Sequence, residues 1–150
     1  MPQLLNQPGL MQEAQCLVGR LQSEHENGRA WEDMAIIYRH NAQATWIEEA
    51  LTSAGIPFTT ARSVSKRKTL YAHDSVKVVS MHSSKGLEFG FVMIPRLHEM
   101  PAQGEDEVDE MRLLYVAMTR AVDRLVMSHQ THSGFTERLE EAINQVKANL

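Results

Sequence analysis

The stretch VKVVSMHSSKGLEFGFVMI, residues 76–94, contains two apolar runs separated by a polar turn. Residues 76–81 and 89–94 each have the length of a strand, and polar residues interrupt them only briefly. Nearly continuous apolar runs of this length are typical of strands buried on both faces of a parallel sheet. Pro95 ends the second run. The stretch therefore predicts two buried strands joined by a turn with Gly86 at its centre.

Helical and strand patterns roughly alternate in the rest of the chain. The spacing of apolar residues predicts further strands over 34–38 and 124–128, and helices over 10–27, 41–54, 109–122 and 135–149. Such alternation favours an α/β sheet covered by helices. We expect residues 1–150 to form a single domain. Residues 59–75, which are polar and basic, are expected to be a connector holding at most one short strand.

Length and composition limit the class of protein. The chain has 150 residues, of which 43% are hydrophobic and 23% charged, and this excludes wholesale disorder. No apolar run approaches the roughly 20 residues of a membrane helix, and we identify no secretory signal. The lone Cys16 excludes an internal disulfide framework and a cysteine-rich zinc site. We therefore expect a cytoplasmic protein.

The formal net charge of −4 by itself weakly disfavours nucleic acid as a partner, but the charge is unevenly placed. Six of the 19 acidic residues lie between Glu99 and Glu110, and the remaining 13 face 15 basic residues. We interpret this acidic run as a solvated loop; a magnesium site is a much weaker alternative. A basic run has two balanced interpretations, a solvated loop or a phosphate-facing segment. It consists of Arg62, Lys66, Arg67 and Lys68.

Polar side chains at three places need an explanation beyond composition. The turn HSSKGLE, residues 82–88, lies where loops of such sheets carry ligands, although a plain strand connection is the alternative. The helix predicted over 109–122 is apolar almost all round yet contains Arg120. A guanidinium there needs an anion, either a carboxylate of this chain or a phosphate. Arg39 follows a buried strand, where it either binds an anion or lies at the surface.

Three segments resemble those of UvrD/Rep-type superfamily 1 DNA helicases, in the family's order. VKVVSMHSSKGLEF, residues 76–89, resembles the fifth motif, and DEMRLLYVAMTRA, residues 109–121, resembles the sixth. MAIIYRHNAQATWIEEALTSAGIPF, residues 34–58, is similar to a segment that carries an arginine-asparagine DNA contact. The resemblance implies the C-terminal RecA-like lobe of a helicase. That lobe is a P-loop NTPase-like α/β domain with a mostly parallel sheet, flanked by helices and lacking its own P-loop.

In this family ATP binds between two lobes and single-stranded DNA crosses both. The resemblance implies that Arg120 is a catalytic arginine finger, a group that accelerates phosphoryl transfer by roughly 10³- to 10⁵-fold. It also implies that Glu88 lies near the ribose and that Gly86 permits the turn that places it. DNA contacts are implied for Arg39, Asn41, Ser80, His82 and Lys85.

Other family features are absent from these 150 residues. The sequence contains no Gly-x-x-x-x-Gly-Lys-Ser/Thr phosphate loop, no acidic pair ending a strand to hold magnesium, and no fourth motif. Only residues 59–75 stand where large members insert a subdomain. We therefore expect a parent helicase whose N-terminal RecA-like lobe holds ATP with Mg²⁺. This chain alone is expected to bind no cofactor or metal and to hydrolyse no ATP. The alternative is a stand-alone, non-catalytic protein- or DNA-binding module.

Overall fold

The central strands are where the sequence pattern places them. The computed structural model describes residues 2–60 and 73–149. Within them, strands β2 (Met34–Tyr38) and β5 (Phe89–Ile94) are buried along their whole length, and β4 (Val76–Ser80) along all but its last residue. Such burial requires cover on both faces of the sheet, and the continuous apolar runs supply the side chains for both. The prediction of a two-side-buried sheet is confirmed.

Three further strands complete a six-stranded sheet of order β1-β6-β5-β2-β4-β3, in which every neighbouring pair is parallel. They are β1 (Gln3–Asn6), β3 (Phe58–Thr60) and β6 (Ala121–His129). The sequence pattern does not predict β1, whose two leucines are too few to form a recognisable apolar run. Its strand conformation comes from pairing with β6, in which Gln3 lies opposite Val126.

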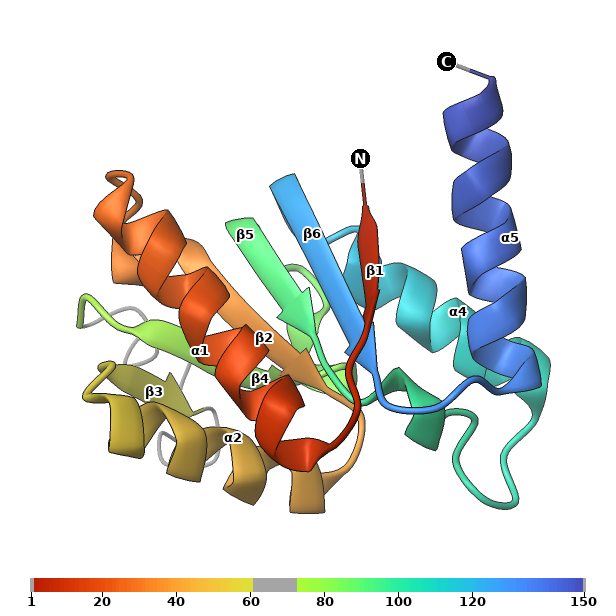
Figure 1. Ribbon diagram of the computed structural model, residues 1–150, viewed down its shortest axis with the longest axis horizontal. Helices are drawn as coiled ribbons and strands as arrows, with labels where there is room; N and C mark the ends of the chain where they lie inside the picture. Colours follow the sequence, from red (N-terminus) through yellow and green to blue (C-terminus); the bar gives the residue numbers. More distant parts are fainter. Residues whose placement is uncertain (1, 61–72, 150) are drawn as a thin grey trace.

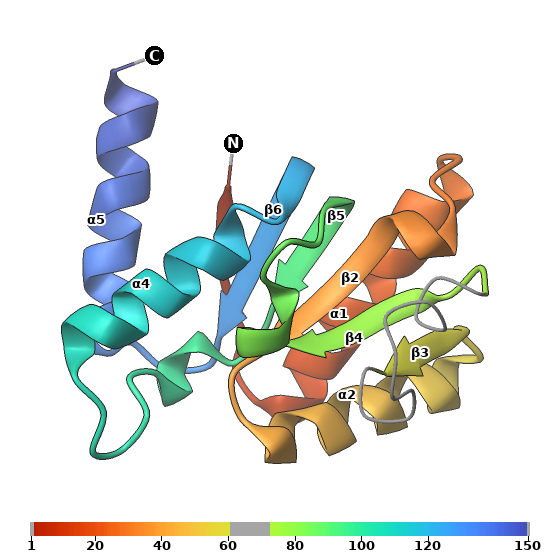
Figure 2. The ribbon, with the colours of Figure 1, turned by 180° about the vertical axis from the view of Figure 1, so that it is seen from behind.

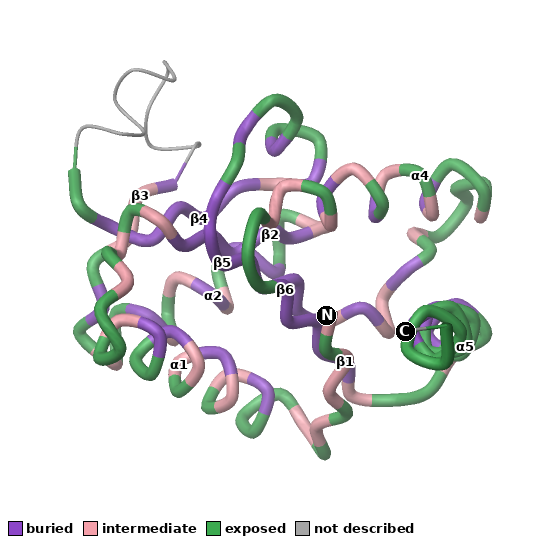
Figure 3. The backbone as a smooth tube through the Cα atoms, turned by 90° about the horizontal axis from the view of Figure 1, so that it is seen from above, coloured by how far each residue is buried: buried purple, intermediate pink, exposed green. Residues whose placement is uncertain are grey.

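Helices cover both faces of the sheet (Figures 1 and 2). The helices are α1 (Leu10–Glu26), α2 (Asn41–Ala54), α4 (Glu107–Met118) and α5 (Gly134–Ala148). Helices α1 and α2 share one hydrophobic core with the sheet, and α4 and α5 share the other. Figure 3 shows α1 and α4 on opposite sides of the buried strands. The chain is thus a three-layered α/β structure, as predicted.

The boundary between α4 and β6 differs from the prediction of a helix over 109–122 and a strand over 124–128. The helix begins at Glu107, with the side chain of Asp106 as its cap, and ends at Met118. The Phe89 N–H donates to the Arg120 carbonyl at 2.9 Å, and Phe89 pairs with Ala121. Pairing with β5 therefore draws residues from 121 onward into the sheet and overrides their helical spacing.

The second helix begins at Asn41, and His40 is its N-cap. Residues 61–72 of the expected connector, including the basic run Arg62, Lys66, Arg67 and Lys68, lie outside the described residues. None of the helices within the described ranges is long and apolar enough to cross a membrane.

Candidate nucleotide and DNA site

A short crossover joins the two groups of predicted site residues. Residues 81–88 lead from the carboxyl end of β4 to the amino end of β5, and β2 lies between these two strands in the sheet. The crossover includes the 3₁₀ turn η2 (His82–Ser84) and passes over the α4 side of the sheet (Figure 2). Met81 and Leu87 anchor it in the core beneath α4. Its two ends therefore lie at opposite ends of the strands. We call the side of the sheet where the parallel strands end its carboxyl edge, and the side where they begin its amino edge.

The residues predicted to bind DNA gather at the carboxyl edge of β2 and β4. Tyr38 pairs with Ser80, so the residues that follow these two strands emerge side by side. Ser80 Oγ donates to Ser83 Oγ at 3.0 Å and accepts from the Ser83 N–H at 3.1 Å, which fixes the start of the crossover. Asn41 and His82 are exposed at this edge. Lys85, also exposed, lies further along the crossover.

Arg39 belongs to the same edge but makes an ion pair within the chain. Its Nη2 lies 2.7 Å from Glu110 Oε1, and its Nε lies 3.1 and 3.0 Å from the two carboxylate oxygens. The Glu110 side chain is 3% exposed and that of Arg39 14%. The hydrogen bond from Arg39 lowers the pKa of Glu110 and raises the pKa of the guanidinium. Glu110 is a site residue that the sequence analysis did not single out from the acidic run.

The lowered pKa of Glu110 predicts a pH-dependent contribution to stability. Because the folded-state pKa lies below the unfolded value of about 4.3, the contribution is complete above that value and is lost as pH falls through the folded pKa. We expect Arg39→Gln to remove this part of the acid sensitivity. Urea unfolding of both proteins between neutral and acidic pH measures it. If the difference in unfolding free energy between the wild type and Arg39→Gln is the same at neutral and acidic pH, the Arg39–Glu110 pair is not the source of this pH dependence.

Arg120 and the turn before β5 form the second group, at the amino edge of the sheet. Arg120 Nη1 donates to the Leu87 carbonyl at 3.2 Å, Nε to the Val116 carbonyl at 3.1 Å, and Nη2 to Thr119 Oγ1 at 3.1 Å. Gly86 has a φ of 82°, which an L side chain rarely adopts, and Glu88, two residues later, is exposed. The structure thus brings Gly86, Glu88 and Arg120 together.

These contacts correct the sequence analysis of Arg120. It follows α4 instead of lying inside a buried helix, and it is partly exposed. Within the described ranges no carboxylate pairs with it; its partners are two carbonyls and a hydroxyl. These bonds use three of the five N–H donors of a guanidinium, and the side chain has room to meet an anion from outside the chain. The residues present fit one side of a nucleotide site.

The acidic run is more structured than a solvated loop. Glu110 is buried against Arg39, Glu107 pairs with Arg138, and Glu99 pairs with Arg96. Glu99 also accepts a hydrogen bond from Gln43. Only part of the run is therefore free for solvent, and its largest effect is to hold Arg39. In the described part of the chain, no group of three His, Cys, Asp or Glu side chains could hold a metal ion.

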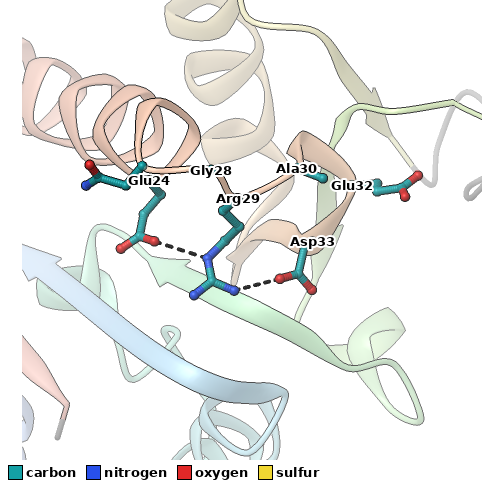
Figure 4. Close-up of a pocket in the computed structure, with 7 residues that line it drawn as sticks. Glu24, Gly28, Arg29, Ala30, Glu32 and Asp33 are labelled. Atoms are coloured by element: carbon teal, nitrogen blue, oxygen red, sulfur yellow. Dashed lines mark hydrogen bonds and ion pairs between the residues drawn. The ribbon is translucent and has the colours of Figure 1, made fainter.

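A cavity of about 850 Å³ lies just before β2, and none of its described lining residues is a predicted site residue (Figure 4). Arg29, the one basic residue that lines it, is held by three carboxylates: Glu24 at 3.0 Å, Asp33 at 2.6 Å and Asp123 at 3.3 Å. The Gly90 N–H also donates to Asp33, and a Cβ at Gly90 would clash with this cluster. We interpret the cluster as structural, since it ties η1 (Trp31–Asp33) to the start of β5 and β6.

An apolar groove of about 690 Å³ runs along α4 and is closed on one side by Arg138 of α5. Val108 and Tyr115 line it and are 55% and 67% exposed. Val122, two residues beyond Arg120, is 67% exposed as well. The helix expected to be buried nearly all round therefore presents an apolar face to its surroundings. The sequence pattern could not distinguish this face from a core face, because both are apolar.

Comparison with known proteins shows what the domain is similar to. Residues 60–132 match the family model of the UvrD-like helicase C-terminal domain. The chain is 37% identical over 67 residues to the ATP-dependent DNA helicase PcrA of Staphylococcus aureus (strain MRSA252), covering 39% of this chain and 9% of that protein. It is 42% identical over 48 residues to DNA helicase II of Escherichia coli (strain K12), covering 32% and 7%. The chain thus matches less than a tenth of the length of these relatives.

Solved structures agree with the family model. The C-terminal domain of a possible DNA helicase from Lactobacillus plantarum WCFS1 superimposes with a TM-score of 0.72 at 25% identity, covering 91% of this chain and 79% of that one. The Hef helicase domain of Pyrococcus furiosus, at 12% identity and a TM-score of 0.57, shares the fold over 87% of this chain and 27% of its own. Residues 60–132 are thus similar to the UvrD-like helicase C-terminal domain, and the chain has a RecA-like α/β fold.

Proposed function

We propose that this chain is the C-terminal motor lobe of an ATP-dependent DNA helicase or translocase. Its partners are single-stranded DNA and the N-terminal RecA-like lobe of the parent protein. The observation that carries the proposal is the crossover 81–88, whose ends hold two different groups of residues. Ser80 and His82 lie at one end beside Arg39, and Glu88 lies at the other beside Arg120.

At the nucleotide edge, Arg120 is proposed to act as an arginine finger. In the parent, ATP with Mg²⁺ bound by the N-terminal lobe would supply the phosphoryl group that is transferred to water. Arg120 would stabilise the negative charge that develops on this group, and Glu88 would accept a hydrogen bond from the ribose. This chain contributes one cation and one carboxylate, and its sequence contains no phosphate loop to bind the β- and γ-phosphates. We therefore expect no ATP turnover above background from the chain alone.

At the opposite edge, Arg39, Asn41, Ser80, His82 and Lys85 are proposed to form part of the DNA track. Cationic side chains bind phosphates, while histidine and amide groups contact bases or sugars. The crossover connects this edge to the Arg120 turn over eight residues and is proposed to couple the two edges. A cytoplasmic location stays a prediction of the sequence.

Weak, salt-sensitive binding of single-stranded DNA tests the proposal. A fluorescent oligothymidine titrated with the chain at increasing salt should show a falling affinity, with a slope of about −0.7 in log-log form for each phosphate contact. Lys85→Ala should reduce that slope by about one contact. Lys147→Ala, the same change near the exposed end of α5, should leave it unaltered. No anisotropy change at low salt and high protein concentration would contradict the DNA track.

The apolar groove beside α4 favours a second function, a non-catalytic protein-binding module. Exposed Val108 and Tyr115 are the kind of surface that binds another protein. The two functions differ in the titration above. If the chain is a motor lobe, it binds oligothymidine through Lys85, and a substitution of Tyr115 does not change this binding. If the chain is a protein-binding module, it does not bind the oligonucleotide.

A further inference from the structure

Arg39 is held by one edge of its guanidinium. Its Nε and Nη2 bond to the Glu110 carboxylate, whereas Nη1 makes no hydrogen bond to any other residue within 2–60 and 73–149. A guanidinium is planar and carries five donors, so a carboxylate on one edge leaves the remaining donors for a second anion. Arg39 is also 14% exposed, which leaves its side chain within reach of a ligand at the surface.

The backbone of Arg39 is also held by a hydrogen bond. Gln43, which is fully buried, accepts from the Arg39 N–H at 2.9 Å and from the His40 N–H at 3.2 Å. Glu110 is itself buried in the first turn of α4. The backbone N–H and the guanidinium of Arg39 are therefore both held by hydrogen bonds before any ligand binds, which lowers the entropy lost on binding.

We infer that Glu110 is a positioning residue, which orients Arg39 so that its free guanidinium edge meets a phosphate of single-stranded DNA. The inference rests on the proposed DNA track and names the residue that makes Arg39 part of it. It also explains why a carboxylate is buried beside a surface proposed to bind an anion. Without a positioning role, a negative charge at that place would only weaken the attraction of a phosphate.

The two roles of Glu110 predict opposite changes in DNA affinity when its charge is removed. Glu110→Gln keeps the size of the side chain and one acceptor oxygen but removes the negative charge. Local electrostatics alone would make this variant bind oligothymidine more tightly. A positioning role predicts weaker binding, by roughly three- to tenfold, because Arg39 must then be ordered when DNA binds. Asp109→Asn is the matched control, since it removes an exposed charge from the same helical turn and should not weaken binding.

The test is a double-mutant comparison on the full chain, with fluorescent oligothymidine as the probe. We expect Glu110→Gln to weaken binding in the wild-type background and to have no further effect in Arg39→Gln. A purely structural role would lower affinity equally in both backgrounds and would overturn the inference. Unchanged or tighter binding by Glu110→Gln alone would also overturn it. If the wild-type chain binds no oligothymidine, both the DNA track and the inference are overturned. If the wild type binds but the Glu110→Gln variant does not bind more weakly, only the inference is overturned.

A second variant covers the case in which Glu110→Gln fails to fold, which circular dichroism would show. Arg39→Lys keeps the positive charge and leaves Glu110 in place, but an ammonium has no second edge once it pairs with the carboxylate. We expect Arg39→Lys to bind oligothymidine as weakly as Arg39→Gln. Binding at the wild-type level would show that charge alone suffices, and would overturn the inference.

Discussion

Replacing Arg120 with alanine in the proposed parent helicase should lower DNA-stimulated ATP hydrolysis by roughly 10³- to 10⁵-fold, the range for removal of an arginine finger. The reason is that Arg120 lies at the proposed nucleotide edge, beside the Gly86–Glu88 turn, and has spare guanidinium donors. Arg120→Lys should recover little activity, because an ammonium cannot reproduce the planar fork. Phosphate release from the purified parent measures the effect.

The matched control for this prediction is Arg112→Ala. Arg112 lies on α4, eight residues before Arg120, is 78% exposed, and lies 3.8 Å from Asp109 in a weak ion pair. Its loss should leave hydrolysis nearly unchanged. Arg120→Ala should keep the fold, since the lost bonds join carbonyls and a hydroxyl near the surface and leave no buried charge unpaired. Near-normal hydrolysis by a folded Arg120→Ala protein would exclude the arginine finger.

Replacing Glu13 with alanine should reduce the free energy of unfolding by about 3 kcal/mol, because three hydrogen bonds to one buried carboxylate are lost together. Glu13 is fully buried in α1. It accepts from the Arg96 N–H at 2.8 Å, Ser128 Oγ at 2.5 Å and Gln130 Nε2 at 3.0 Å. These bonds join α1 to the ends of β5 and β6, and the buried Ser128 hydroxyl would lose its partner.

Urea unfolding compares Glu13→Ala with Glu26→Ala. Glu26 lies on the same helix but is exposed, so its removal should change the unfolding free energy by less than about 0.5 kcal/mol. Equal, small effects of the two substitutions would show that the buried carboxylate does not hold the three segments together. A large loss for Glu13→Ala alone would confirm that it does.

The sequence predicts the parts of the fold that depend on local pattern. The strands over 34–38 and 89–94 have the predicted bounds, because buried parallel strands are continuous apolar runs. The helix predicted over 10–27 ends one residue earlier. The end of α4 is predicted wrongly, because residues 119–122 continue a helical apolar spacing while Ala121 pairs with Phe89 of β5. Pairing between distant strands is not visible in a local window.

The sequence predicts the candidate site residues but not the partners that hold them. The family motifs bring Arg39, Ser80, His82, Glu88 and Arg120 to attention, and the structure places them at two edges joined by one crossover. The partners that fix these residues are not predictable from spacing. Glu110 is 71 residues from Arg39 in the sequence. Among the six acids between Glu99 and Glu110, nothing in the sequence marks the buried one.

The net charge of −4 is a poor guide to the partner of this chain. Much of it resides in the acidic run, where Glu110 pairs with Arg39, Glu107 with Arg138 and Glu99 with Arg96. The charges of these three acids are compensated locally by ion pairs within the chain. The distribution of charge at the carboxyl edge of β2 and β4 is therefore the relevant quantity for the proposed DNA binding.

Amide chemical-shift mapping of the ¹⁵N-labelled chain with oligothymidine tests the central claim most directly. The proposed DNA track predicts that the largest shifts cluster at residues 39–41 and 80–85, at one edge of the sheet, and that they disappear at high salt. Shifts confined to the α4 groove around Val108 and Tyr115, or no shifts at millimolar oligothymidine and low salt, would contradict it.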